Sequence, residues 1–187
     1  GVEDYRGYIV NKGTEKSADE VRKQLYQCAA FTNGMQLLDL GNIKAGATYV
    51  DTLVAVVETL HELFKHNVIT IIIGGDTALS SAQFKAYEIF ENQITVAQIA
   101  SKVVWDNSDV DIHKTYLKDF FLSSFLRKYN LVAYQSYFIQ EKQLSFIRSK
   151  NHDVLRVGKI REHVFEAEPY LREAAMVTYN INAIRYS

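Results

Sequence analysis

Residues 68–76 read VITIIIGGD, and this stretch decides the fold. All six residues from 68 to 73 are β-branched, and the run ends at two glycines. Such residues favour strands, and an apolar run without regular polar alternation is typical of a strand buried on both faces of a parallel sheet. The sequence therefore predicts a central strand at 68–73, followed by a turn.

Outward from this run, helix-like and strand-like periods alternate, which favours an α/β fold with a mostly parallel sheet. Further strands are predicted at 36–40, 94–99, 131–138 and 176–181. Amphipathic helices are predicted at 18–30, 49–65, 79–91, 112–128, 141–149 and 168–175. Ser17 and Asp51 are expected to cap the first two helices, and Asn67 suits a left-handed residue after the second.

The length, charge and cysteine content of the chain bear on its domain number, its partners and its compartment. The chain has 187 residues, a formal net charge of −1 and one proline, so we expect a single domain over 1–187. A near-neutral charge argues against nucleic acid and anionic membranes as partners, and no apolar run approaches the length of a membrane span. The one cysteine, Cys28, cannot form an internal disulfide, which favours the cytoplasm, and it is expected to pack on the apolar side of its helix.

Two loops carry polar groups of chemical interest. The turn at 74–81 follows a predicted strand, where open α/β sheets build their sites, but it lacks the dinucleotide and phosphate-loop fingerprints. From the residues alone, a structural turn is the favoured interpretation. The acidic loop at 106–113 lacks the spacing of a calcium-binding EF-hand, so Asp109 or Asp111 is expected to cap the next helix.

Several segments, in order, resemble the arginase, agmatinase and formimidoylglutamase family (ureohydrolases), particularly the divergent arginase-like proteins of Bacteroidetes. They are 3–7 (EDYRG), 18–26, 39–43, 71–76 (IIIGGD), 134–138 and 178–185 (TYNINAIR). The resemblance implies a three-layer α/β/α fold. It also implies two manganese ions at the carboxyl ends of the strands, where they activate a bridging water.

The metal ligands of the family are replaced at the matching positions. The first histidine falls on Thr77, while the preceding Asp76 is kept but is not a ligand. The Asp-x-His-x-Asp cluster falls on Ala100, Lys102 and Val104, and the last Asp-x-Asp cluster falls on Asn180 and Asn182. The resulting degenerate cleft comprises Gly74, Gly75, Asp76, Thr77, Ala100, Lys102, Val104, Asn180 and Asn182.

This loss of ligands favours a non-catalytic binding or scaffold protein with no cofactor and no catalytic residues. A protein partner or a homo-oligomer and a small polar ligand are expected. One alternative is a manganese-dependent hydrolase of linear amidines; another is a phosphate- or nucleotide-binding α/β module using the turn at Gly74. Against the family pattern the chain is truncated at both ends, so a partner or a further segment is expected to cover the exposed sheet edges.

Overall fold

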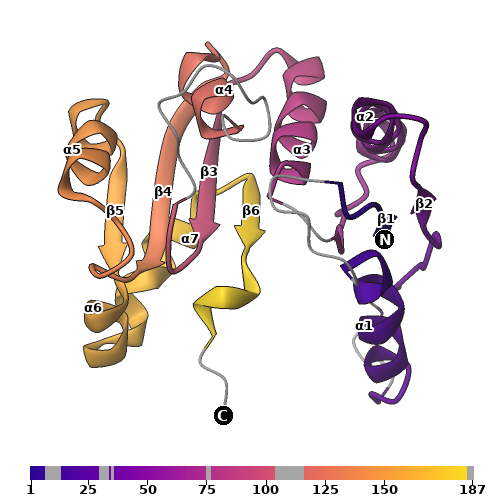
Figure 1. Cartoon of the computed structure of the whole chain (residues 1–187), viewed down its shortest axis with the longest axis horizontal. Coiled ribbons are helices and arrows are strands. Elements are labelled where there is room, and N and C mark those ends of the chain that lie inside the picture. Colours follow the sequence, from indigo (N-terminus) through magenta and orange to yellow (C-terminus); the bar gives the residue numbers. More distant parts are fainter. Residues whose placement is uncertain (7–13, 30–33, 35, 75–76, 104–115, 185–187) are drawn as a thin grey trace. The chain divides into compact units, whose positions relative to one another are not determined.

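A computed structural model describes residues 1–6, 14–29, 34, 36–74, 77–103 and 116–184 (Figure 1). The chain forms two compact units, Gly1–Ala86 and Tyr87–Ser187. None of the helices in the described ranges has the length and apolar character of a membrane span. The organisation as one domain stays a prediction.

The second unit is built on a four-stranded parallel sheet (Figure 1). Its strands are β3 (Ile94–Ile99), β4 (Leu126–Tyr134), β5 (Asp153–Arg156) and β6 (Met176–Tyr179), in the order β5-β4-β3-β6. Ile99, the last residue of β3, lies beside Val132 of β4 and Tyr179 of β6. Five of the six residues of β3 are buried, so this strand is the centre of the unit.

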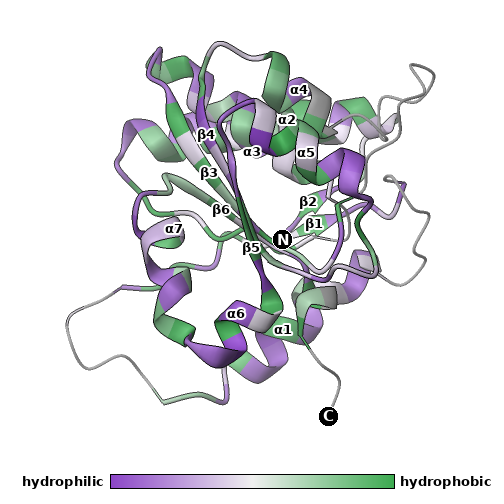
Figure 2. Cartoon of the chain, turned by 90° about the vertical axis from the view of Figure 1, so that its left-hand side faces the viewer, coloured by the Kyte–Doolittle hydropathy of each residue, from purple (hydrophilic) through white to green (hydrophobic). Residues whose placement is uncertain are grey.

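Helices cover both faces of this sheet. They are α4 (Tyr116–Leu122), α5 (Glu141–Ser149), α6 (Val157–Glu162) and α7 (Glu168–Arg172), with short 3₁₀ helices η2 (Glu88–Phe90), η4 (Val164–Ala167) and η5 (Ile181–Ala183). Tyr129 contacts Phe121 of α4, whereas the next residue, Asn130, donates to the Tyr170 carbonyl of α7. Successive strand side chains point to opposite faces, so α4 and α7 lie on opposite sides of the sheet (Figure 2).

The first unit pairs two short parallel strands, β1 (Val2–Glu3) and β2 (Ile43–Lys44). Its helical elements are η1 (Thr14–Lys16), α1 (Ser17–Leu25), α2 (Tyr49–Lys65) and α3 (Leu79–Tyr87), the last of which ends at the boundary between the units. The buried face of α2 consists of Tyr49, Thr52, Val56, Leu60 and Phe64, at helical spacing.

A buried carboxylate joins β1 to α2. Asp4 is 2% exposed; it accepts hydrogen bonds from the Arg6 guanidinium (2.8 Å) and from the Thr52 hydroxyl (2.6 Å). The Thr52 oxygen also accepts the Gly46 N–H at 3.0 Å. Burial opposes the charged form of Asp4, but the bonds from Arg6 and Thr52 outweigh it and lower the pKa of the carboxyl.

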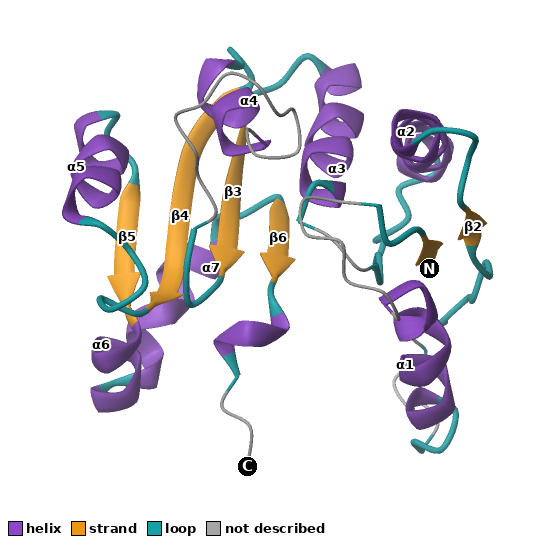
Figure 3. Ribbon diagram, viewed as in Figure 1, coloured by secondary structure: helices purple, strands orange, loops and turns teal. Residues whose placement is uncertain are grey.

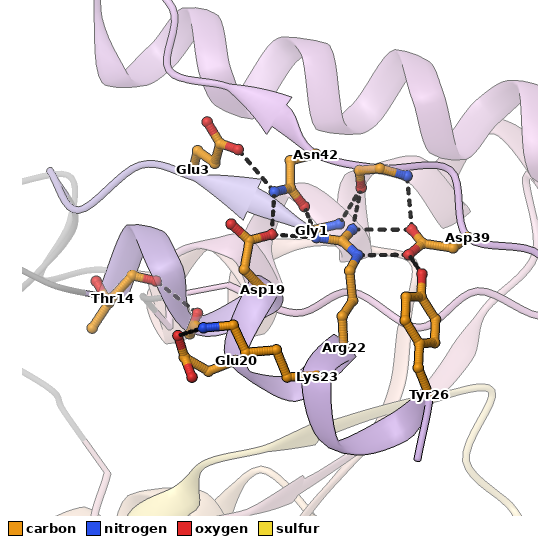
Figure 4. Close-up of polar contacts among 12 residues, drawn as sticks. Gly1, Glu3, Thr14, Asp19, Glu20, Arg22, Lys23, Tyr26, Asp39 and Asn42 are labelled. Carbon is orange, nitrogen blue, oxygen red and sulfur yellow. Dashed lines mark hydrogen bonds and ion pairs between the residues drawn. The ribbon is translucent and has the colours of Figure 1, made fainter. Parts of the chain in front are cut away.

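A second polar cluster attaches α1 to the segment before β2 (Figure 4). The Arg22 guanidinium donates to Asp39 (2.6 Å), Asp19 (2.8 Å) and the Gly41 carbonyl (2.7 Å), and the Tyr26 hydroxyl donates to Asp39. The bond from Arg22, followed by that from Tyr26, lowers the pKa of Asp39 strongly. Because the cluster is exposed, its role is mainly to fix the path of the chain.

Several predicted elements are confirmed. The strand at 94–99 and the helices at 49–65 and 141–149 have the predicted bounds, and Asn67 is left-handed with φ of 55°. The helices predicted at 18–30, 79–91 and 168–175 form but end earlier. Asp51 takes part in a capping box with Thr48, which is the actual N-terminal cap.

The central strand predicted at 68–73 is wrong. In this segment Ile69 is 95% exposed and Ile71 is 77% exposed, and no ladder is assigned to it. The Ile73 carbonyl accepts the Val2 N–H at 2.9 Å. A β-branched sequence forms a strand only where a neighbour supplies a ladder, and β1 is too short to supply one.

Three further predictions need correction. The segment 36–40 is irregular, and the pairing strand of this region is β2, at Ile43–Lys44. Residues 112–115 of the helix predicted at 112–128 lie outside the described residues, and the rest of that prediction is too long, since α4 ends at Leu122 and β4 begins at Leu126. Between them, the Ser123 hydroxyl accepts the Phe125 N–H. The strand predicted at 131–138 accordingly ends at Tyr134.

Two residues on α1 also differ from expectation. Ser17 lies within α1, and its hydroxyl donates to the Thr14 carbonyl, so it does not cap the helix. Cys28 is exposed, because α1 ends at Leu25 before an apolar face can include it. The loop with Asp109 and Asp111 lies outside the described residues.

A histidine lies at the start of β5. The Nδ1 atom of His152 accepts the Tyr129 N–H at 3.3 Å, and its ring stacks on Phe121 with the centroids 5.1 Å apart. Burial lowers the pKa of His152, and the ammonium groups of Lys128 and Lys150 lower it further, while Asp153 opposes them. The neutral imidazole is therefore the form that fits between β4 and α4.

We expect Thr52→Val to lower the free energy of unfolding by about 2 kcal/mol, because the Asp4 carboxylate loses a donor and the Gly46 N–H loses an acceptor. Urea denaturation at pH 7 measures the change. Thr59→Val is the matched control, since Thr59 is exposed on the same helix; its effect should stay within about 0.5 kcal/mol. Equal losses in the two variants would contradict the role given to Thr52.

We also expect His152 to make stability fall in mild acid. Because the folded-state pKa lies below the ordinary value of 6.5, its contribution is complete above that value and is lost as the pH falls towards the folded-state pKa. Denaturation between pH 8 and 5 should therefore show a shallower pH dependence in His152→Asn than in the parent. His163→Asn, which removes an exposed histidine, is the control, and identical slopes in His152→Asn and the parent would refute the assignment.

Candidate functional site

The candidate site lies at the carboxyl edge of the parallel sheet in the second unit. The arrowheads of β3, β4, β5 and β6 point to the same end of the sheet (Figure 3). Loops that follow parallel strands meet at this edge, which is where open α/β folds bind ligands. The residues just beyond the strands therefore define the chemistry of the site.

Two of the predicted cleft residues are neighbours at this edge. Ala100 follows β3, and its N–H donates to the Val132 carbonyl at 3.1 Å. Asn180 follows β6, and its N–H donates to the Ile99 carbonyl at 2.9 Å. Ala100 is 1% exposed, so only a methyl group occupies this first strand-end position. The neighbouring strand-end residue Asn180 is half-buried and has a neutral amide side chain.

The loop after β3 continues into a buried serine and an exposed lysine. The Ser101 carbonyl accepts the Gln135 N–H at 2.9 Å, which holds this loop against the end of β4. Lys102, the next residue, is exposed. An ammonium group thus stands where the family resemblance expects a metal-binding histidine.

The end of β4 contains a bulge. Ala133 has φ of 68°, and the register with β5 shifts between Val132 and Tyr134. A non-glycine residue in this conformation is strained, and bulges re-aim the side chains that follow them. The shift brings Tyr134 level with Arg156, the last residue of β5. Arg156 therefore joins the same edge as Lys102.

The charge at this edge is positive within the described residues. The four residues after each strand, 100–103, 135–138, 157–160 and 180–183, include neither Asp nor Glu. Lys102 and Arg156 form no ion pair with any described residue. Among the described residues of this edge, a metal cation would therefore meet positive side chains rather than carboxylates.

The other predicted cleft residues lie elsewhere or outside the described residues. Gly74 and Thr77 belong to the first unit, where a Cβ on Gly74 would lie 2.1 Å from Leu79 Cδ1, so this glycine permits a close contact. Asn182 lies in η5 after β6. Gly75, Asp76 and Val104 are outside the described residues. The structure thus brings together Ala100, Lys102 and Asn180.

Comparison with solved structures identifies the fold. The manganese-containing formiminoglutamase of Trypanosoma cruzi matches 87% of this chain and 60% of its own, with 16% identity and a TM-score of 0.77. The formimidoylglutamase of Bacillus subtilis subsp. subtilis str. 168 matches 96% of this chain and 62% of its own, with 17% identity and a TM-score of 0.79. The agmatine ureohydrolase of Thermoplasma volcanium matches 96% of this chain and 64% of its own, with 12% identity and a TM-score of 0.72.

The chain has the ureohydrolase fold. The fold implied by the sequence resemblance is therefore confirmed, and the chain spans 60–64% of the length of these ureohydrolase structures. No family model matches the sequence, and no curated protein matches it. The likeness lies in the arrangement of strands and helices.

The strand-end residues do not fit the manganese pair that this ureohydrolase fold implies. At the described positions, Ala100 has only a methyl group and Lys102 has an ammonium group, neither of which can coordinate a metal. Asn180 has a neutral amide. Manganese prefers carboxylate and imidazole donors. Within the described ranges, no group of three or more His, Cys, Asp or Glu side chains could hold a metal ion.

One site residue, Arg156, was missed by the sequence analysis. The segment 153–156 is a four-residue strand with charged residues at both ends, and neither β5 nor α6 was predicted. The left-handed Asn151 just before it was an available signal for a turn between α5 and a new strand. Sheet order, which places Arg156 two strands from Lys102, was not available from the sequence.

The burial of Ala100 makes a carboxylate at this position unfavourable for stability. We expect Ala100→Asp to lower the free energy of unfolding by about 3 kcal/mol, because a charge would be buried at a position 1% exposed. Ala100→Asn, with nearly the same shape, separates charge from volume and should cost less at pH 7. Equal losses by urea denaturation would show that volume alone keeps this position small.

Proposed function

We propose that this chain is a member of the ureohydrolase family without the dinuclear manganese site, acting as a non-catalytic binding or scaffold subunit. One observation carries the proposal: neighbouring strand ends of the fold present buried Ala100, cationic Lys102 and neutral Asn180. The sequence resemblance assigns metal ligands to these positions, and none of the three residues is suited to bind manganese.

The electrostatics support the same conclusion. Two divalent cations a few ångströms apart repel each other strongly unless anionic ligands neutralise them. Lys102 and Arg156 add positive charge to the edge, and the residues that directly follow the strands supply no carboxylate. Without the metal pair, there is no activated bridging water for hydrolysis.

The proposal includes a partner. Exposed apolar side chains in the first unit, including Ile69, Ile71 and Leu38, favour coverage by a protein partner or a second copy. The single cysteine, Cys28, favours the reducing environment of the cytoplasm. We place neither nucleic acid nor a membrane among the partners, since the formal net charge is −1.

The alternative is a manganese-dependent hydrolase of linear amidines. The likeness to a manganese-containing formiminoglutamase and an agmatine ureohydrolase favours it, since the chain spans 60–64% of such structures and the remaining parts carry further residues. In that case the metal would be held with ligands that are not among Ala100, Lys102 and Asn180.

Manganese binding and turnover, measured on one sample, test the proposal. After purification with manganese, we expect less than about 0.1 manganese per chain by elemental analysis. We expect no urea or formamide above background with arginine, agmatine or formimidoylglutamate. The formimidoylglutamase of Bacillus subtilis, prepared in the same way, is the positive control for loading and assay. About two manganese ions per chain, with turnover abolished by a chelator, would overturn the proposal in favour of the hydrolase.

A further inference from the structure

Two cations that form no ion pair with a described residue lie at the carboxyl edge of the sheet in the second unit. Lys102 follows β3 and Arg156 ends β5, with β4 between them. Neighbouring strands lie about 4.8 Å apart, so the ends of β3 and β5, at Ile99 and Leu155, are about 10 Å apart. Lys102 and Arg156 follow these ends and have long side chains, so both belong to the edge above the end of β4.

The sheet holds these two residues in a fixed relation. The bond from the Gln135 N–H to the Ser101 carbonyl ties the loop that carries Lys102 to the end of β4. The register that pairs Tyr134 with Arg156, set by the strained Ala133, ties β5 to the same place. Strain of this kind is concentrated at functional sites. The backbone that carries Arg156 is therefore fixed by the sheet, and the loop that carries Lys102 is bonded to the end of β4 through Ser101.

The Arg156 guanidinium lies close to the backbone of Gly158. A Cβ on Gly158 would lie 3.0 Å from one terminal nitrogen of the Arg156 guanidinium and 3.2 Å from Nε. The guanidinium thus lies close over the backbone of Gly158, where a larger residue would crowd it. Arg156 also has no acidic partner among the described residues, so the donors of its planar group are not committed to an ion pair.

Neutral polar groups complete the edge. Asn180 follows β6, on the other side of β3 from β4, and its N–H donates to the Ile99 carbonyl at 2.9 Å. Ser101, which follows Ala100, is buried. The four residues following each strand bring no carboxylate to repel an anion.

We infer that this edge binds a small oxyanion, a carboxylate or phosphate group, between Lys102 and Arg156. The inference rests on the proposed function, because a manganese pair at these strand ends would take up the same space. Arg156 would bind two oxygens of the anion through its fork of N–H donors, and Lys102 would add a mobile point charge.

Isothermal titration with inorganic phosphate and with succinate, on the whole chain at low ionic strength, tests the inference. We expect saturable binding with one site per chain for at least one probe, and the tighter probe tells phosphate from carboxylate recognition. Lys102→Gln and Arg156→Gln should each weaken binding about tenfold, as expected for a charge-assisted hydrogen bond. Binding should also weaken as salt is raised.

A matched variant controls for net charge. Lys142 on α5 is exposed and forms no ion pair with a described residue, so Lys142→Gln removes the same charge away from the edge and should leave the affinity unchanged. Absence of saturable binding, equal weakening in Lys142→Gln, or no weakening in the two edge variants would each overturn the inference. Circular dichroism and the unfolding midpoint of each variant show whether it folds, and Arg156→Lys replaces Arg156→Gln if that variant does not.

The two proposals fail in different ways. Manganese at about two ions per chain with turnover overturns the proposed function, whatever the anion titration shows. A manganese-free, inactive chain that binds neither phosphate nor succinate overturns only the anion site. Running both measurements on one preparation therefore separates them.

Discussion

The pairing of β3 on both of its edges is the constraint on which the second unit depends. Its backbone is bonded to β4 on one side and β6 on the other, and its polar side chains are buried with partners. Thr95 accepts from Arg127 Nε at 3.1 Å, and Gln98 accepts from the Tyr129 hydroxyl at 2.6 Å. Because buried polar groups are costly when unpaired, these contacts fix the register of the strands. The register in turn decides which residues meet at the carboxyl edge.

An apolar face, a cap and a left-handed residue at the end were enough to predict those helices that do not depend on partners distant in sequence. The helix α2 has a continuous apolar face, a capping box and a left-handed stop at Asn67, so its bounds follow from the sequence. The segment 68–73 has an equally strong local preference, yet it forms no ladder because its neighbour β1 is only two residues long. Strand propensity describes how well a residue fits a sheet, and a sheet needs partners that are distant in sequence.

In the candidate site, too, some residues could be predicted from the local sequence and others depend on strands that are distant in sequence. The match of Ala100, Lys102 and Asn180 to metal-ligand positions is a prediction from the sequence resemblance. The structure adds that the register of β3 and β6 makes Ala100 and Asn180 neighbours. Arg156 could not be placed in the site from sequence, because its position depends on β5 being the edge strand of the order β5-β4-β3-β6. A four-residue strand with charged ends carries little periodicity, so the pattern that reveals longer elements was absent.

The parallel sheet explains how one site can change the sign of its ligand while the fold stays. A parallel arrangement brings the loops after every strand to one edge, so a few substitutions there alter the local charge without touching the buried strands. Carboxylates at these positions would favour cations; a buried methyl, an exposed ammonium and an amide reverse that preference, and Arg156 strengthens it from a third strand. The stability of the unit depends on β3 and its hydrogen-bonded polar side chains, which lie below the edge. Stability and ligand preference therefore depend on different residues, so the exchange of metal binding for anion binding that we propose would require no change in the buried strands.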